Sequence, residues 1–157
     1  MTSDVSSVLE NVLVGMADLF GVDGAALMLL DGQDRLRAVG ATDDDGVSLE
    51  SAQESVGDGP AIESAAHGDL VAIHDLHAAS PLGFPHVAVH ALPVHSVLSV
   101  PLVEGSELIG VLDFYARAGR VWDSAEAEAG SCLGELMVIV LQVLAETRTE
   151  RGQDGQL

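Results

Sequence analysis

Two neighbouring stretches, Val94–Val103 and Leu108–Tyr115, carry groups that could do chemistry in an alternating pattern. In a strand, side chains at odd and even positions point to opposite faces. The odd positions hold a mixture of polar and apolar side chains, namely His95, Val97, Ser99, Ile109, Val111, Asp113 and Tyr115. The even positions are almost wholly apolar, with Leu98, Val100, Leu112 and Phe114 among them. The mixed face is too polar for ordinary core and too apolar for open solvent, so we expect it to floor a pocket.

Asp113 is the carboxylate in the middle of this mixed face. A buried carboxylate without a partner costs several kcal/mol, so it must be hydrogen-bonded or open to a pocket. Two interpretations follow for Asp113: a ligand-binding carboxylate, or a structural one that accepts from backbone amides of a loop. Ser99 and Tyr115 share its face and could contact a ligand or pack in the core.

The six histidines fall within one third of the chain, at His67, His74, His77, His86, His90 and His95. His86 and His90 are four residues apart and would share a face of a continuous helix, which is a spacing of metal ligands. Pro85 and Pro93 bracket that segment, so we expect surface or pocket-lining histidines and assign no metal ligand. A haem or metal sensor is the alternative, and the cofactor stays unknown.

Motifs of catalysis are missing from the sequence. No GxSxG, HExxH or P-loop pattern occurs. The single cysteine, Cys132, excludes an intramolecular disulfide and a cysteine-based zinc site. Its place among Leu133 and Leu136 predicts a small buried side chain. We therefore expect a protein that is not an enzyme.

Charge is the extreme feature of the composition. The 157 residues include six arginines and no lysine, with a formal net charge of −19. Nucleic acids and anionic membrane surfaces are therefore unsuitable partners. The start of the chain lacks the pattern of a signal peptide, which predicts a cytoplasmic protein. One domain is expected over residues 1–150, followed by a disordered tail over 151–157.

Hydrophobic periodicity and turn residues predict the order of the elements. The expected elements are a helix over 5–20, strands over 24–33 and 35–42, a loop over 43–47, short helices over 48–56 and 61–68, a third strand over 69–76, an irregular stretch over 77–85, a short helix over 84–92, the two central strands, and a helix from 123 or 124 to about 148. This order is an α+β plan with one antiparallel sheet.

The turn between the two central strands sets their register. Gly105 supplies the positive φ of a three-residue loop over 104–106, with Val103 opposite Glu107. In that register Ser99 pairs with Val111, Val97 with Asp113, and His95 with Tyr115.

The last helix carries apolar residues around its whole circumference. Such a helix must be buried on all sides. One side can pack on the sheet, and the rest needs the first helix or another chain. We therefore predict a homodimer that forms through the first and last helices.

Three segments make the chain resemble the GAF family of small-ligand sensor domains. They are SVLSVPL followed by LIGVLDFYA, GDGPAIESAAHG before LVAIHDL, and the Trp122-Asp123 entry to the last helix. The resemblance runs from about Val5 to Arg148 and is nearest to actinobacterial GAF domains that accompany ANTAR-type or two-component output modules. It implies a profilin-like sheet with the terminal helices on one face and a pocket on the other, covered by short helices and loops.

The combined interpretation is a regulatory domain that binds an unknown small molecule on the mixed face. Its floor would hold Asp113, Ser99, His95, Tyr115 and Val97, and its wall or lid would hold Phe84, His74, His86 and His90. The alternative is a ligand-free interaction module whose pocket is filled by its own side chains and whose surface recruits a regulatory protein.

One enzyme group of similar fold, the free methionine sulfoxide reductases, also shares the GVLD strand that contains Asp113. Those enzymes depend on pocket cysteines, whereas the thiol here lies on the last helix, and Val97 stands where they carry an acidic residue. The resemblance therefore implies regulation rather than thiol chemistry.

Overall fold

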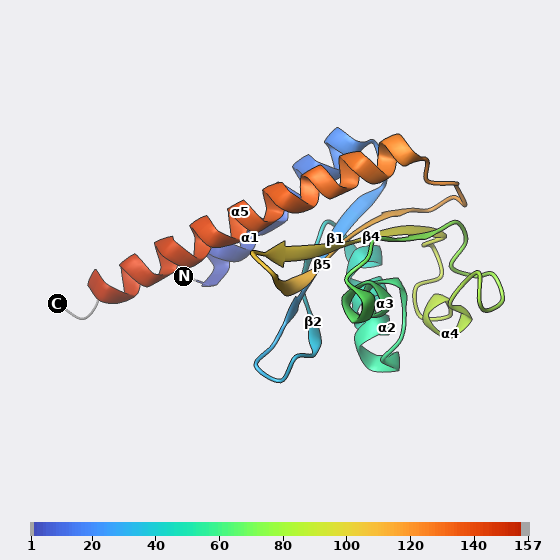
Figure 1. The fold of residues 1–157 in the computed structure, drawn as a ribbon, viewed down its shortest axis with the longest axis horizontal. Helices are drawn as coiled ribbons and strands as arrows, with labels where there is room; N and C mark the ends of the chain where they lie inside the picture. Colours follow the sequence, from blue (N-terminus) through green and yellow to red (C-terminus); the bar gives the residue numbers. More distant parts are fainter. Residues whose placement is uncertain (1, 155–157) are drawn as a thin grey trace.

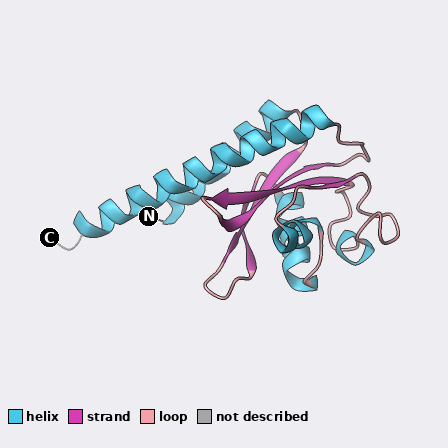
Figure 2. Cartoon of the chain, in the orientation of Figure 1, coloured by secondary structure: helices cyan, strands magenta, loops and turns pink. Residues whose placement is uncertain are grey.

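The computed structural model describes the backbone of residues 2–154 and the side chains of residues 4–147. A five-stranded antiparallel sheet of order β2-β1-β5-β4-β3 separates two layers of helices (Figure 2). The elements in chain order are α1 (Thr2–Phe20), β1 (Gly24–Leu30), β2 (Leu36–Ala41), α2 (Asp44–Val56), α3 (Pro60–His67), β3 (Val71–Ile73), α4 (Pro85–Ala88), β4 (Ser96–Glu104), β5 (Glu107–Ala116) and α5 (Ser124–Asp154). This is the predicted α+β class with the predicted placing of the terminal helices.

Helices α1 and α5 lie side by side on one face of the sheet (Figure 1). Leu112 and Phe114 of β5 meet Leu13 of α1 and Met137 of α5 in one fully buried apolar cluster. The aromatic ring of Phe20 packs on Phe114 with 4.7 Å between ring centres. This face is therefore closed by apolar contacts.

Helices α2, α3 and α4 lie on the opposite face (Figure 1). Asp43 caps α2 by accepting a hydrogen bond from the Gly46 amide at 3.1 Å, and helix α3 begins at Pro60 after Gly59. Gly68, with a φ of 69°, ends α3 in the left-handed conformation that favours glycine.

The central hairpin differs from its predicted register by two residues. Ser99 pairs with Asp113, and Val97 pairs with Tyr115. The turn has two residues rather than three, because Glu104 pairs with Glu107, and Gly105 with a φ of 65° begins it. A β-bulge between Leu102 and Val103 adds the second step of the shift.

A shift of two residues leaves every side chain on its predicted face, because strand side chains alternate with a period of two. Leu98 and Phe114 indeed face α1 and α5, whereas Val97 and Tyr115 face α2 and α4. Ile109 is the exception: it sits at the bulge and packs with the cluster on the α1–α5 side, so its predicted place on the mixed face is wrong.

Several predicted boundaries also change. Helix α2 starts at Asp44 rather than Ser48, because Asp43 acts as its N-cap and the segment predicted as a loop forms the first turn. Strands β1, β2 and β3 and helix α4 are shorter than predicted. Helix α5 continues past Arg148 to Asp154, into the segment predicted as a disordered tail, and the final residues 155–157 lie outside the described residues.

Cys132 is exposed, which corrects the prediction of a buried thiol. It lies beside Leu133, which faces the sheet, so a rotation of about 100° along the helix carries it to the outer side. By length and composition alone, α5 over Ser124–Thr147 could cross a membrane. Its residues Leu133, Met137 and Val138 belong to the core, and 28% of its most apolar stretch is buried.

Candidate functional site

Asp113 lies at the centre of a buried polar cluster that we define as Glu50, Gln53, Ser99 and Asp113. Ser99 donates its hydroxyl to Asp113 Oδ1 at 2.5 Å, as the cross-strand register requires. Gln53 of α2 donates Nε2 to Asp113 Oδ2 at 3.1 Å. Its Oε1 accepts from the Ala61 amide of α3 at 2.8 Å. One amide side chain therefore ties the strand β5 to two helices.

Glu50 lies one helical turn before Gln53 and is 1% exposed. Gln53 Nε2 lies 3.5 Å from Glu50 Oε1, whereas Glu50 Oε2 has no hydrogen-bond partner among the described residues. An unpaired polar atom in a dry interior is costly. Glu50 is therefore the member of the cluster that has an unsatisfied buried oxygen.

The two carboxyls share their electrostatic environment. Burial, and then the charge of Asp113, raise the pKa of Glu50 well above its usual range. Burial also raises the pKa of Asp113, against which the neighbouring Glu50 carboxyl and the hydrogen bonds from Ser99 and Gln53 act. Within the described part of the chain no basic side chain pairs with either group. The two carboxyls therefore titrate as a coupled pair, in which the pKa of Glu50 is raised the more strongly.

Tyr115 belongs to a different network, at the end of β5. Its hydroxyl donates to Asp43, the N-cap of α2, and lies 3.1 Å from Thr42 Oγ1. Arg117 then holds Asp43 at 2.6 Å through Nη2 and Asp45 at 2.7 Å through Nε. Burial, followed by the Asp43 hydrogen bond, raises the pKa of Tyr115. These contacts fix the start of α2 to the sheet.

His95 forms a third group, at the start of β4. Its Nδ1 lies 3.3 Å from Asp75 Oδ1, and its ring stacks on His77 with 4.3 Å between ring centres. His77 Nε2 lies 3.0 Å from the Val94 carbonyl oxygen. The hydrogen bond from the backbone amide of His77 is the largest cause that lowers the pKa of Asp75, and the hydrogen bond with the His95 ring lowers it further. His95 therefore contacts a loop rather than Asp113.

Apolar side chains fill the space between these groups. Phe84 and Val97 lie in one buried cluster with Leu49, Leu76 and Val87. Asp113, Ser99, Val97 and Tyr115 are each 0% exposed, so the mixed face is closed to solvent in this structure.

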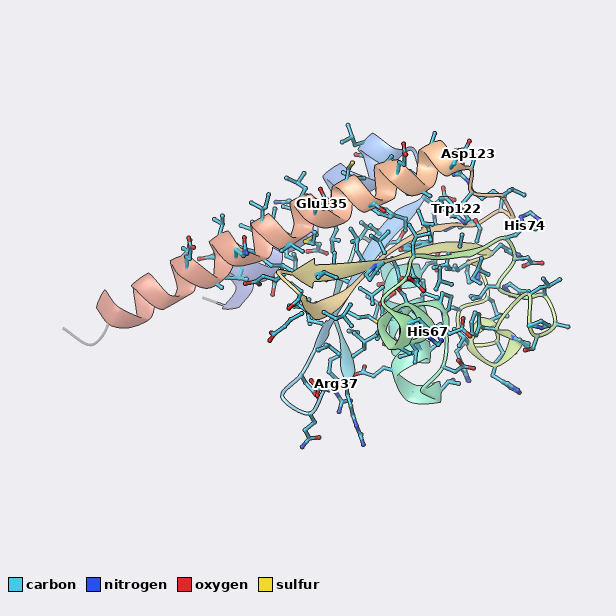
Figure 3. All side chains as sticks on the ribbon, in the orientation of Figure 1. Arg37, His67, His74, Trp122, Asp123 and Glu135 are labelled. Carbon is cyan, nitrogen blue, oxygen red and sulfur yellow. The ribbon has the colours of Figure 1, made fainter. Side chains whose placement is uncertain are left out.

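The three remaining predicted histidines, His74, His86 and His90, are exposed. His86 and Phe84 line a cavity of about 250 Å³ beside α4, and His74 lies at the end of the molecule that carries Trp122 (Figure 3). The structure thus joins Asp113 with Ser99 and separates both from the histidines and from Tyr115. Within the described residues, no three His, Cys, Asp or Glu side chains are grouped as a metal site would need.

The prediction from the sequence did not include two members of the buried polar cluster, Glu50 and Gln53. A signal did exist, because both share a helical face with Leu49 and Ala52, which are buried. Polar residues three apart on a short helix usually indicate its solvent side, so that signal was ambiguous.

Comparison with known proteins gives one family match and many similar folds. The model of the GAF domain family matches residues 2–142. No curated protein matches the chain.

The fold is similar to that of a type II free methionine-R-sulfoxide reductase from Thermoplasma acidophilum, with 16% identity, a TM-score of 0.69, and coverage of 87% of this chain and 91% of that one. It is similar to the GAF domain of a phosphoenolpyruvate-protein phosphotransferase from Coxiella burnetii, with 16% identity, a TM-score of 0.67, and coverage of 92% and 86%. The GAF domain of the cyanobacteriochrome TePixJ has 21% identity, a TM-score of 0.66, and coverage of 89% and 90%. Identities this low establish a shared fold and no shared activity.

Proposed function

Because the chain belongs to the GAF domain family, we propose that it is a regulatory module of signal transduction that pairs with a second copy through α1 and α5. Control of transcription is one output that suits such a module, and the cytoplasm is its proposed location. The main support for this pairing is an exposed row of apolar side chains along α5.

Three apolar side chains form this row: Leu136, Ile139 and Val143 are 47%, 54% and 53% exposed. Their spacing of three and four residues puts them on one side of the helix. Spacing of this kind is typical of a seam between helices, since each apolar side chain fits between those of the facing helix. Val8 and Val14, on the neighbouring helix α1, are also exposed apolar side chains.

Helix α5 also reaches beyond the sheet. Its 31 residues correspond to about 46 Å, and its second half projects past the strands in Figure 1. A projecting helix with an apolar side suits a partner helix, and a second copy offers an identical seam, as in two-fold symmetric dimers.

Sedimentation velocity at micromolar concentration tests the pairing. We expect the unaltered protein to sediment as a dimer and Ile139→Glu to sediment as a monomer, because a charge in the seam would be desolvated. Val89→Glu is the matched control, since Val89 is 59% exposed and ends α4, which lies on the opposite side of the sheet from α5. A monomeric unaltered protein, or an unaffected Ile139→Glu dimer, would contradict the proposal.

A role without catalysis fits the position of the thiol. One similar structure is a free methionine-R-sulfoxide reductase, whereas Cys132 here is exposed on α5, on the other side of the sheet from Asp113. Regulation rather than reduction is therefore the proposed activity.

A second candidate is the closed interaction module, and the filled mixed face favours it. Phe84 and Val97 are buried where a ligand would have to lie. A sensor using Asp113 would have to open the segment over residues 76–92. Native mass spectrometry of protein purified from cells distinguishes the two: a bound small molecule that Asp113→Asn removes would support the sensor, and bare protein would support the closed module.

A further inference from the structure

A cavity of about 570 Å³ lies on the α2–α3 side of the sheet, and its lining includes none of the four residues of the buried polar cluster. The hairpin of β1 and β2 forms one wall, and α2 and α3 form the other. Its apolar lining consists of Leu30, Leu36, Ile62, Ala65, Ala66 and Leu108. The volume lies within the range of small-molecule sites.

The walls of this cavity are held together across its edge. Arg37 of β2 contacts Asp31 at 2.9 Å through Nε and Glu54 of α2 at 3.2 Å through Nη1. Figure 3 shows Arg37 at the end of the β1–β2 hairpin, on the far side of the sheet from α5. Because these ion pairs join strand to helix, the cavity exists before any ligand arrives, which reduces the entropy cost of binding.

The rim carries two exposed charged side chains that have no partner among the described residues. Asp34 and Arg35 both line the cavity, and neither side chain forms an ion pair or hydrogen bond with the rest of the described protein. By contrast, Arg117 binds three aspartates and Arg120 binds Glu126. Arg35 is therefore the unpaired arginine among those whose side chains are described.

The C-terminal end of helix α2 also lies in the cavity wall. Helix α2 stops at Val56, and Gly57 lines the cavity. The final carbonyl groups of a helix carry partial negative charge, which suits an ammonium group.

We propose that this cavity binds a small zwitterion, with an ammonium group toward Asp34, a carboxylate toward Arg35 and an apolar body on the floor. A simple anion would be repelled by the net charge of −19. A simple cation would leave Arg35 unpaired. A zwitterion satisfies both rim charges and carries no net charge.

An apolar amino acid and a short apolar peptide share this chemistry. The volume accommodates either, so the two sources must be separated by experiment. Its lining shares no residue with the candidate site predicted on the mixed face, and it does not depend on pairing through α5.

Titration calorimetry with leucine, N-acetylleucine and leucinamide tests the charges. These ligands share one side chain and differ only in being zwitterion, anion and cation. We expect leucine to bind and each derivative to bind at least about tenfold more weakly, since each lacks one charged hydrogen bond. Leucyl-leucine provides the peptide arm: if it binds more tightly than leucine, the ligand is a peptide, and if more weakly, a free amino acid.

Three variants locate the site. Asp34→Asn, which tolerates the φ of 60° at this position, should remove the preference for leucine over N-acetylleucine. Arg35→Gln should remove the preference over leucinamide. Ala66→Phe should block binding, and because Ala66 is exposed this variant should still fold. Asp18→Asn, an exposed acidic residue on α1, is the control.

The proposal is overturned by any of three results. They are equal binding of the three leucine compounds, binding that survives Ala66→Phe, and an absence of binding at millimolar concentration.

Discussion

On the face of the sheet that α1 and α5 cover, Leu112 and Phe114 meet apolar side chains, whereas Asp113, between them in sequence, points to the other face and meets Gln53 of α2. Both faces exclude water, and all three β5 residues are fully buried. Apolar contacts need only complementary shape. Polar contacts need a hydrogen-bond partner for each buried atom. In this cluster they also depend on a proton held by the pair of buried carboxyl groups, Glu50 and Asp113. Closure of the face that α2 covers should therefore depend on pH, whereas closure of the apolar face should not.

The largest effect is expected on the apolar face. Phe114→Ala should lower the free energy of unfolding by about 3 to 5 kcal/mol, because it deletes a fully buried ring and leaves a cavity. Urea denaturation followed by circular dichroism measures this. A loss below about 1 kcal/mol, the level of a surface substitution, would show that the apolar face is loosely packed.

Gln53→Leu probes the mixed face, with little change in the size of the side chain. It leaves Asp113 Oδ2 and the Ala61 amide without their donor and acceptor. We expect a loss of about 2 to 4 kcal/mol, from two buried polar groups at about 1 to 3 kcal/mol each with partial relaxation. The same urea titration measures it. A neutral result would mean that water reaches the cluster and that the mixed face opens readily.

Glu50→Gln tests whether closure depends on the proton. The folded protein holds a proton on Glu50 above the pH at which the unfolded chain releases it. The stability from this group is therefore complete below the unfolded pKa and is lost as pH rises toward the raised folded pKa, at about 1.4 kcal/mol per pH unit. Glu50→Gln should flatten that decline and exceed the unaltered protein in stability at neutral pH and above.

Asp113 contributes to the same slope in the same direction, because its pKa is also raised. Asp31, whose pKa is lowered to about 2 by the Arg35 amide and then by Arg37, contributes stability that is lost only as pH falls toward that value. Urea titrations between pH 5 and pH 8 therefore isolate the buried pair. Glu63→Gln, an exposed change on α3, is the control. Parallel curves for Glu50→Gln and the unaltered protein would contradict a proton on Glu50.

The division of side chains between the two faces could be predicted, since alternation fixes it for any even shift of register. The pairing of Ser99 with Asp113 could not, because a glycine turn admits loops of two or three residues and the bulge at Ile109 has no sequence mark. The predicted site failed for a related reason. Asp113, Tyr115 and His95 share a strand face but bond to three different loops and helices, and no alternation pattern identifies such partners.

The cavity beside Arg37 escaped prediction because its walls come from five elements that only the fold brings together. The exposed apolar side of α5 was predictable, since apolar residues around the whole helix are visible in the sequence, whereas pairing through that side stays a prediction. The prediction of a buried Cys132 applied the same pattern too broadly, since the pattern identifies an apolar helix but not which side meets the sheet.

Glu54→Gln should have the smallest effect, although Glu54 is the next residue after Gln53. Its carboxylate pairs with Arg37 at 3.2 Å where both side chains are partly exposed to water. Solvent and salt screen such a pair, so its loss should cost less than about 1 kcal/mol and should shrink further in 1 M salt, where the Debye length is about 3 Å. Urea titrations at low and high salt measure both. A cost equal to that of Gln53→Leu would mean that charge at the rim, rather than burial, holds α2 on the sheet, and the distinction between the two faces would then lose its physical basis.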